Sequence, residues 1–353
     1  MSEKRHKRPG VYSAYDAAAV ISAAKGSKAI GVAAKAARGT AGETVTVTSY
    51  AAGVAAFGED TDPGMSTLLR LLFLGGAVKV VAVRVADTAT LADYQKAFET
   101  LGKQDVQVVL CDSGELTVQQ ALRSAVETAS DQRRERIAVV GADGATVAEL
   151  VERAAALNSE RMVLVGPDAL DSSGTRLPGM FTAAAVAAVI AAGRDPAVPL
   201  NGTELHGLGG LTEDYNDNDI DLLVRGGVTP LESVGGVISP VRGITTRTTT
   251  GGVADATWRE LTTILVVDDI IPTVRAALRS KFSRAKNTAR GRGAIRSQVI
   301  VELEKKMAAE IIDGYGEVTV TADPEDPTVC LVEFSFAVAH GLNQIYLTVH
   351  ITV

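Results

Sequence analysis

Four short apolar runs alternate with amphipathic segments in the first half of the chain. The runs lie at residues 77–85, 106–111, 136–141 and 161–166. Between them, apolar residues recur with helical spacing over residues 91–101, 116–134 and 146–157. Strands that alternate with helices of this length pair in parallel through right-handed crossovers. The sequence therefore predicts an α/β domain with a mostly parallel sheet and crossover helices.

This alternation stops near residue 193, and the composition then changes. We place the α/β domain at residues 21–240, including a helix over residues 63–76 and a Pro- and Gly-rich loop over residues 193–210. The apolar stretch at residues 180–192 is too short for a membrane span and has the length of a buried helix. A β-prone stretch at residues 237–250 follows a short helix that starts near Asp219.

Residues 241–353 are expected to form a different, α+β module. One helix is predicted from about Trp258, kinked or restarted at Pro272, and a second over residues 294–312. Strands are predicted at residues 316–322 and 328–338, with a tight turn between them, and at the closing residues 343–353. The second half of the chain is therefore helical first and β-structured afterwards.

The chain begins and ends with extended segments. The closing "NQIYLTVHITV" has the alternation of a half-buried strand and could extend about 36 Å at ~3.3 Å per residue. Residues 1–16 are predicted to be an extended arm, because Pro9 fixes its own φ and the following side chains suit strand. The residues that we assign to these two arms are Pro9, Gly10, Val11, Tyr12, Tyr15, Ile345, Tyr346, Leu347, Val349, Ile351 and Val353.

A basic stretch near the predicted turn between the two helices contrasts with the net charge of −7. It contains eight cations and no acid: Arg275, Arg279, Lys281, Arg284, Lys286, Arg290, Arg292 and Arg296. Such a stretch is either a solvated surface or a docking face for an acidic partner. The net negative charge argues against a general nucleic-acid binder.

Motifs of catalysis and metal binding were sought in the sequence without success. Phosphate-binding and dinucleotide-binding glycine motifs, the GxSxG elbow and HExxH are all absent. "DYNDNDID" resembles a calcium loop, but Asp219 stands where the loop needs Gly and Arg225 where it needs Glu. We interpret Asn216 or Asp217 as the cap of the short helix. We expect no catalytic residue, no cofactor and no metal.

Several segments in order resemble the contractile tail sheath proteins of bacteriophages and related injection particles. These are "RPGVY", "KAIGVAAKAARGTAGETVTVTSYAAGVAAFG" and "LLFLGGAVKVVAVRV" in the first half. The second half adds "GGVISPVRGITTRTTT", "WRELTTILVVDDIIPTVRAALRSKF", "DGYGEVTV" and "GLNQIYLTVHITV". "RGTAGE" replaces a proline-containing RGP that many members carry. The resemblance covers nearly the whole chain.

The resemblance implies a structural subunit that polymerises helically around a rigid tail tube and contracts to drive it through a cell envelope. The two arms would add strands to neighbouring subunits, and the basic stretch would face the tube. The implied partners are other copies of the chain, the tube protein, and baseplate and terminator proteins, without direct nucleic-acid binding or membrane insertion. The implied location is the bacterial host cytoplasm during assembly, then the virion tail or a related particle.

Two alternatives remain open on the residues alone. An α/β enzyme that binds a small molecule or nucleotide would place its site at carboxyl strand ends, near Asp112 or residues 141–143. A monomeric binding module would pair the closing strand within its own sheet.

Overall fold

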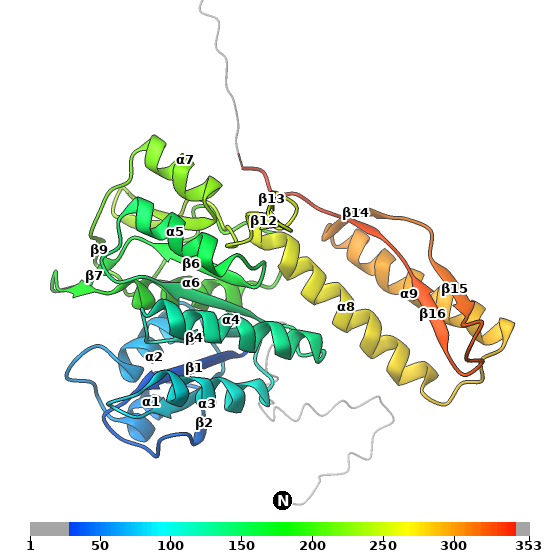
Figure 1. Ribbon diagram of the computed structural model, residues 1–353, viewed down its shortest axis with the longest axis horizontal. Helices are drawn as coiled ribbons and strands as arrows, with labels where there is room; N and C mark the ends of the chain where they lie inside the picture. Colours follow the sequence, from blue (N-terminus) through cyan, green and yellow to red (C-terminus); the bar gives the residue numbers. More distant parts are fainter. Residues whose placement is uncertain (1–27, 344–353) are drawn as a thin grey trace, which may run out of the picture.

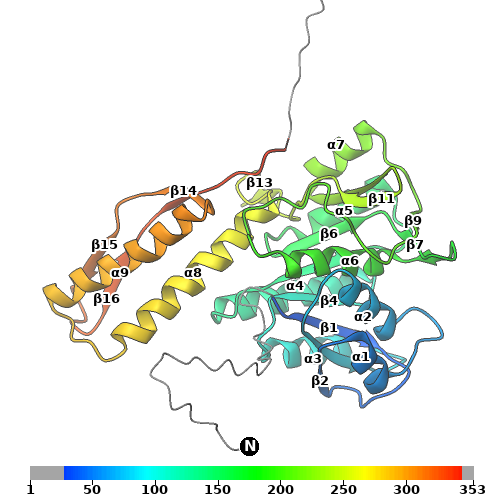
Figure 2. The same cartoon turned by 180° about the vertical axis from the view of Figure 1, so that it is seen from behind.

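A computed structural model describes residues 28–343 as a broad α/β body from which two long helices and a β-hairpin project (Figure 1). The view from behind shows α8 leaving the body at its first turns, with α9 and the hairpin on its far side (Figure 2). We call the projecting part the module. The mixed α/β class with a mostly parallel sheet is confirmed.

An eight-stranded sheet forms the centre of the body, in the order β11-β10-β6-β5-β4-β1-β3-β2. Its six inner strands are parallel, and the edge strands β2 and β11 are antiparallel to their neighbours. The strands are β1 (Ile30–Lys35), β2 (Thr44–Val47), β3 (Val80–Val85), β4 (Val108–Cys111), β5 (Ile137–Gly141), β6 (Met162–Gly166), β10 (Val228–Val234) and β11 (Val237–Pro240). Almost every inner-strand residue is buried, as expected for a sheet covered on both faces.

Seven helices cover the two faces of this sheet. One face packs against α1 (Tyr50–Phe57), α2 (Met65–Leu74) and α6 (Gly179–Ala192), and the other against α3 (Leu91–Gly102), α4 (Leu116–Asp131), α5 (Val147–Leu157) and α7 (Asp217–Arg225). The predicted buried helix at residues 180–192 corresponds to α6, nearly all of which is buried. Asn216 caps α7 by accepting from Asn218 N and Asp219 N, which confirms the predicted cap.

Two small sheets lie beside the central one. The first pairs β7 (Ala169–Leu170) with β8 (Arg176–Leu177) and β9 (Gly210–Leu211), and the second pairs β12 (Thr249–Thr250) with β13 (Val253–Ala254). The rest of residues 193–209 is loop, as predicted.

The module consists of α8 (Leu261–Phe282), α9 (Ala289–Ala308) and a long irregular hairpin, residues 312–338, which we call the ribbon. The ribbon pairs β14 (Ile312–Tyr315) with β17 (Phe336–Val338) and β15 (Thr319–Ala322) with β16 (Cys330–Glu333). Leu261 and Ile264 of α8 pack in the body, whereas Ile270 and Val274 pack in the module. One helix therefore belongs to both cores. The division of the chain at residue 241 stays a prediction.

Three details of the module differ from the sequence prediction. α8 runs without interruption through Pro272, so a helix restart there is wrong. α9 begins at Ala289, because Thr288 Oγ1 caps it by accepting from Gly291 N, and it ends at Ala308 instead of continuing to residue 312. Glu310 has φ +56°, and the chain reverses there so that Ile312 starts β14.

The sequence prediction also missed α1 and two strands of the sheet, the central β1 and β10. All eleven arm residues named above lie outside the described residues, so their pairing stays a prediction.

Candidate assembly surfaces

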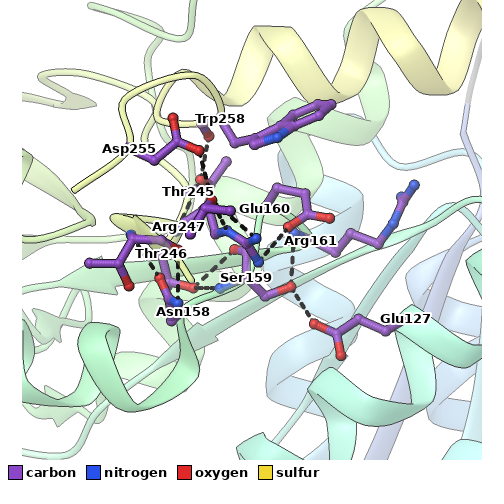
Figure 3. Close-up of polar contacts among 12 residues, drawn as sticks. Glu127, Asn158, Ser159, Glu160, Arg161, Thr245, Thr246, Arg247, Asp255 and Trp258 are labelled. Carbon is purple, nitrogen blue, oxygen red and sulfur yellow. Dashed lines mark hydrogen bonds and ion pairs between the residues drawn. The ribbon is translucent and has the colours of Figure 1, made fainter. Parts of the chain in front are cut away.

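The segment before α8 is hydrogen-bonded to the end of α5 (Figure 3). Thr246 Oγ1 donates to Ser159 O and accepts from Ser159 N, both at 3.0 Å. Asn158, the left-handed C-cap of α5, accepts through Oδ1 from Thr248 N and Thr249 N, and its Nδ2 donates to Thr249 O. These reciprocal bonds fix the chain that leads from the body into α8.

Two ion pairs fix α8 itself against the body. Arg161 of β6's amino end binds Asp268 through both guanidinium nitrogens, at 2.8 and 3.1 Å, and both side chains are less than 15% exposed. Arg275 donates to Glu135 Oε1 at 2.6 Å. Burial raises the pKa of Asp268, although the hydrogen bonds and charge of Arg161 oppose this. Burial also opposes ionisation of Glu135, but the bond from Arg275 lowers the pKa of Glu135 overall.

Both ends of the described chain lie at the base of α8. Lys28 N donates to Ala191 O, and the Lys28 side chain lines a cavity of about 210 Å³ together with Leu265. At the other end, Asn343 Oδ1 accepts from Asn201 Nδ2 at 2.9 Å. Lys28 and Asn343, the first and last described residues, therefore both lie at the joint between body and module.

The ribbon is only two strands wide, and its apolar face is incompletely covered. Val332, Phe334, Phe336 and Val338 alternate along one strand and face the module core, yet each is only half-buried. Gly316 N donates to Ser335 O at 2.9 Å, which joins the two halves of the ribbon. Within residues 28–343 no further strand pairs with either edge of the ribbon, and a free edge presents a row of unpaired backbone groups. The ribbon can therefore accept additional strands on either side.

The basic stretch separates into two groups of four. Arg275, Lys281, Arg292 and Arg296 bond within the chain, to Glu135, Gln298 Oε1, Asn287 Oδ1 and Val318 O respectively. The side chains of the other four are exposed and make no hydrogen bond or ion pair with any other residue in the range 28–343; these tip cations are Arg279, Arg284, Lys286 and Arg290. They gather at the far end of the module, where α8 ends and α9 begins.

The carboxyl ends of the strands, where the enzyme alternative would place a site, form a cleft of about 610 Å³. Asp112 is engaged there, since its Oδ2 accepts from Lys35 N and its Oδ1 from Tyr94 OH, at 2.7 and 2.6 Å. Burial raises the pKa of Asp112 and of Tyr94. Arg176 binds both Asp143 and Asp168. Asp112, Asp143 and Asp168 are thus each bonded to another residue of the cleft.

Residues 28–343 contain no cluster of three or more His, Cys, Asp or Glu side chains that could hold a metal ion. None of their helices combines the length and hydropathy of a membrane span.

The sequence did not reveal two features of this surface. The bond between Arg161 and Asp268 joins residues 107 apart, and no local pattern marks either one. The ribbon's apolar face did have a signal, the period-two alternation in "CLVEFSFAV", but that signal predicts a strand without showing how wide its sheet is.

The sequence matches two domain families. The phage tail sheath protein central domain matches residues 87–246, and the phage tail sheath C-terminal domain matches residues 253–352. The tail sheath protein of Bacillus phage SP01 is 32% identical over 270 residues, which are 74% of this chain and 46% of that protein. The tail sheath protein of Mycobacterium phage Bxz1 is 26% identical over 164 residues, 42% of this chain and 28% of that protein. The chain thus spans less than half the length of these relatives.

Solved sheath structures share the fold. The sheath tail protein of Desulfitobacterium hafniense superimposes with a TM-score of 0.71 at 12% identity, over 93% of this chain and 100% of that one. The contracted sheath of the anti-feeding prophage gives 0.71 at 14% identity, over 98% and 99%. The contracted sheath of the PVC extracellular contractile injection system gives 0.70 at 15% identity, over 99% of each chain. With both domain families matched in order along it, this chain belongs to the phage tail sheath family.

Proposed function

We propose that this protein is the repeating subunit of a contractile sheath, which polymerises helically around a rigid tube and contracts to drive that tube through a cell envelope. The observation that carries the proposal is the ribbon. Its inward aromatic residues, Phe334 and Phe336, are half-buried, and neither of its edges is paired with another strand of the described chain. Strands donated by neighbouring copies would complete the burial and satisfy the edges.

The donated strands in this proposal are the two arms, residues 1–16 and 343–353. The positions of Lys28 and Asn343 support this, because the described chain begins and ends beside the base of α8, next to the module that carries the ribbon. A contact in which different surfaces of identical subunits meet does not close on itself and generates an open helix. The arms would keep subunits linked while the lattice rearranges.

The tip cations are the proposed contact with the tube. Four exposed positive side chains without internal partners lie together at the free end of the module. An acidic tube surface would supply the missing counter-charges, and such exposed pairs influence association and its salt dependence. The bonded cations, such as Arg296, instead hold the module together.

We infer a structural role rather than catalysis. The energy for contraction would be stored in the extended lattice and released as subunits move to a tighter packing, without a nucleotide. The further proposed partners are baseplate and terminator proteins at the ends of the sheath. Assembly would take place in the bacterial host cytoplasm, and the product would be part of a virion tail or of a related injection particle.

Electron microscopy of the purified full chain, with and without its tube protein, tests this function. We expect hollow, helically ordered cylinders, and contraction of tube-containing particles by mild denaturant in buffer that lacks ATP and divalent metal. A strict nucleotide requirement, or a chain that stays monomeric under all conditions, would refute the sheath function. In the first case the cleft beside Asp112 becomes the site to probe.

A further inference from the structure

A groove lies between α3 and α4 on the outer face of the body. Its volume is about 680 Å³, and Phe98, Ala121, Ala125 and Ala129 form an apolar floor. α3 and α4 each run from the carboxyl ends of the parallel strands toward the amino ends of those strands. The groove is formed by the second half of each helix. It therefore opens at the amino end of the sheet. No other segment of residues 28–343 lines it.

An exposed apolar hairpin tip lies at the opposite end of the same sheet. β10 and β11 are joined by the two-residue turn of Gly235 and Gly236, which have φ +61° and +84° as such tight hairpins require. Val234 and Val237 flank the turn and are 64% and 41% exposed. A Cβ on either glycine would meet no atom within 4 Å, so the hairpin tip projects freely. Because β10 is parallel to β6, this tip lies at the carboxyl end of the sheet.

The charges at the two ends are complementary. The titratable side chains that line the groove are Lys103, Arg134 and Glu99, so cations are in excess. Close to the hairpin lie Glu232 on β10, and Glu213, Asp214, Asp217 and Asp219 around the start of α7, which packs against β10. The apolar residues and the charges therefore both favour contact between a hairpin tip and an α3–α4 groove.

We propose that, in the assembled sheath, the tip of the β10–β11 hairpin of one subunit docks in the α3–α4 groove of a second copy. The two surfaces lie at opposite ends of one sheet, so they cannot meet within a chain. They join copies head to tail, which is a contact that propagates into an open helix. This contact rests on the proposed sheath function, but it involves the body and is independent of the arms and the module.

A pair of engineered cysteines tests the contact in assembled cylinders. Val237→Cys and Ala125→Cys are introduced together in a Cys330→Ser chain, which leaves only the buried Cys111. A disulfide forms only when the two Cα atoms approach within about 7 Å. We expect the double variant to give a ladder of covalently linked subunits on oxidation, in extended or contracted cylinders, and each single variant to give none. Cylinders of the double variant without any ladder would overturn the proposal.

A charged substitution at the tip of the β10–β11 hairpin tests the same contact independently. Val234→Lys should leave the monomer melt nearly unchanged, since this side chain is 64% exposed, and should lower the denaturant concentration at which cylinders dissociate, because it places a cation opposite the cations of the groove. Val253→Lys is the matched control, on the exposed β12–β13 hairpin, with a side chain that is 71% exposed. The proposal would be overturned if the denaturant concentration at which cylinders dissociate fell equally in both variants. Failure of the unmodified chain to form cylinders would instead refute the sheath function, and this contact with it.

Discussion

Gly141 and Gly179 allow the start of α6 to touch the end of β5 backbone to backbone. Gly179 N donates to Ala142 O at 2.9 Å, and a Cβ added to Gly141 would lie 2.0 Å from Gly179 O. Backbone atoms cannot rotate away from such a clash. We therefore expect Gly141→Ala to lower the free energy of unfolding by about 1–3 kcal/mol or more, measured by denaturant titration of the monomer.

The matched control is Gly102→Ala at the end of α3. A Cβ there would meet no atom within 4 Å, and Gly102 has helical neighbours. Alanine should be neutral or stabilising by up to about 1 kcal/mol, because it favours helix. Similar losses in the two variants would mean that the contact between α6 and β5 is looser than described.

Arg161 and Asp268 form the most buried tie between the sheet and α8. Removing one partner leaves an unpaired buried charge, so Arg161→Met should cost about 3–5 kcal/mol in denaturant unfolding. Burial raises the folded-state pKa of Asp268 above its unfolded value, and Arg161→Met removes the hydrogen bonds and charge that oppose this, so folding of the variant favours the neutral carboxyl over the charged one. The loss should therefore be larger at neutral pH than in mildly acidic buffer.

The double variant Arg161→Met, Asp268→Leu provides the control for this pair. Replacing a buried ion pair by apolar side chains is often nearly neutral, so the double variant should recover most of the lost stability and lose the pH dependence. If the double variant is as unstable as Arg161→Met alone, packing around the methionine is the cause rather than the unpaired carboxylate.

At the scale of elements, the free end of the module carries the four tip cations. Reversing Arg284, Lys286 and Arg290 to Glu should leave the melt of the subunit unchanged, because these side chains have no partner in the described chain. The same variant should bind its tube more weakly, most clearly at low ionic strength where exposed charges are least screened. Co-sedimentation of subunits with purified tubes measures this.

A control for charge alone is Lys79→Glu with Lys96→Glu, at two exposed cations of the body. This variant also becomes more acidic, but its changes lie away from the module. We expect its tube binding to match that of the unmodified chain. Unchanged binding in the tip variant would assign the tip cations to a merely solvated surface.

The elements that the sequence predicted well are those with strong periodicity. The runs that become β3 to β6 and the helices α3 to α5 could be placed because long amphipathic helices separate short apolar strands. β1 was missed because "IGVAAK" has small residues and no clear period. β10 was missed because it contains Pro230, which argues against a strand within a sheet. Both segments form strands because of their contacts with neighbouring strands that are distant in sequence.

The assembly surfaces were predictable only in part. The basic stretch could be located from composition, but which of its members are bonded internally depends on distant partners, such as Glu135 for Arg275, 140 residues away. Likewise, the alternation that predicts the ribbon's strands does not show that only two strands form it. Contacts between parts far apart in sequence have no local signal.

At the scale of the whole molecule, the arms are the test of how subunits connect. In the ribbon Phe334 and Phe336 are half-buried and neither edge is paired within residues 28–343, and the described chain begins and ends beside the base of α8. If the arms belong to neighbours, deleting residues 345–353 or residues 1–15 should leave a soluble, folded monomer that forms no cylinders. Circular dichroism, sedimentation and electron microscopy of the two truncated chains measure these outcomes.

A change within the ribbon separates donated strands from strands of the subunit's own fold. Phe336→Ser removes an aromatic side chain from a strand that pairs with β14 of the same chain, so it should lower the stability of the monomer itself. The truncations should not, because a donated strand stabilises only the lattice. If a truncated chain aggregates or loses its cooperative melt, the deleted segment pairs within the sheet of its own subunit. Intact cylinders from either truncation would equally refute linkage through that arm.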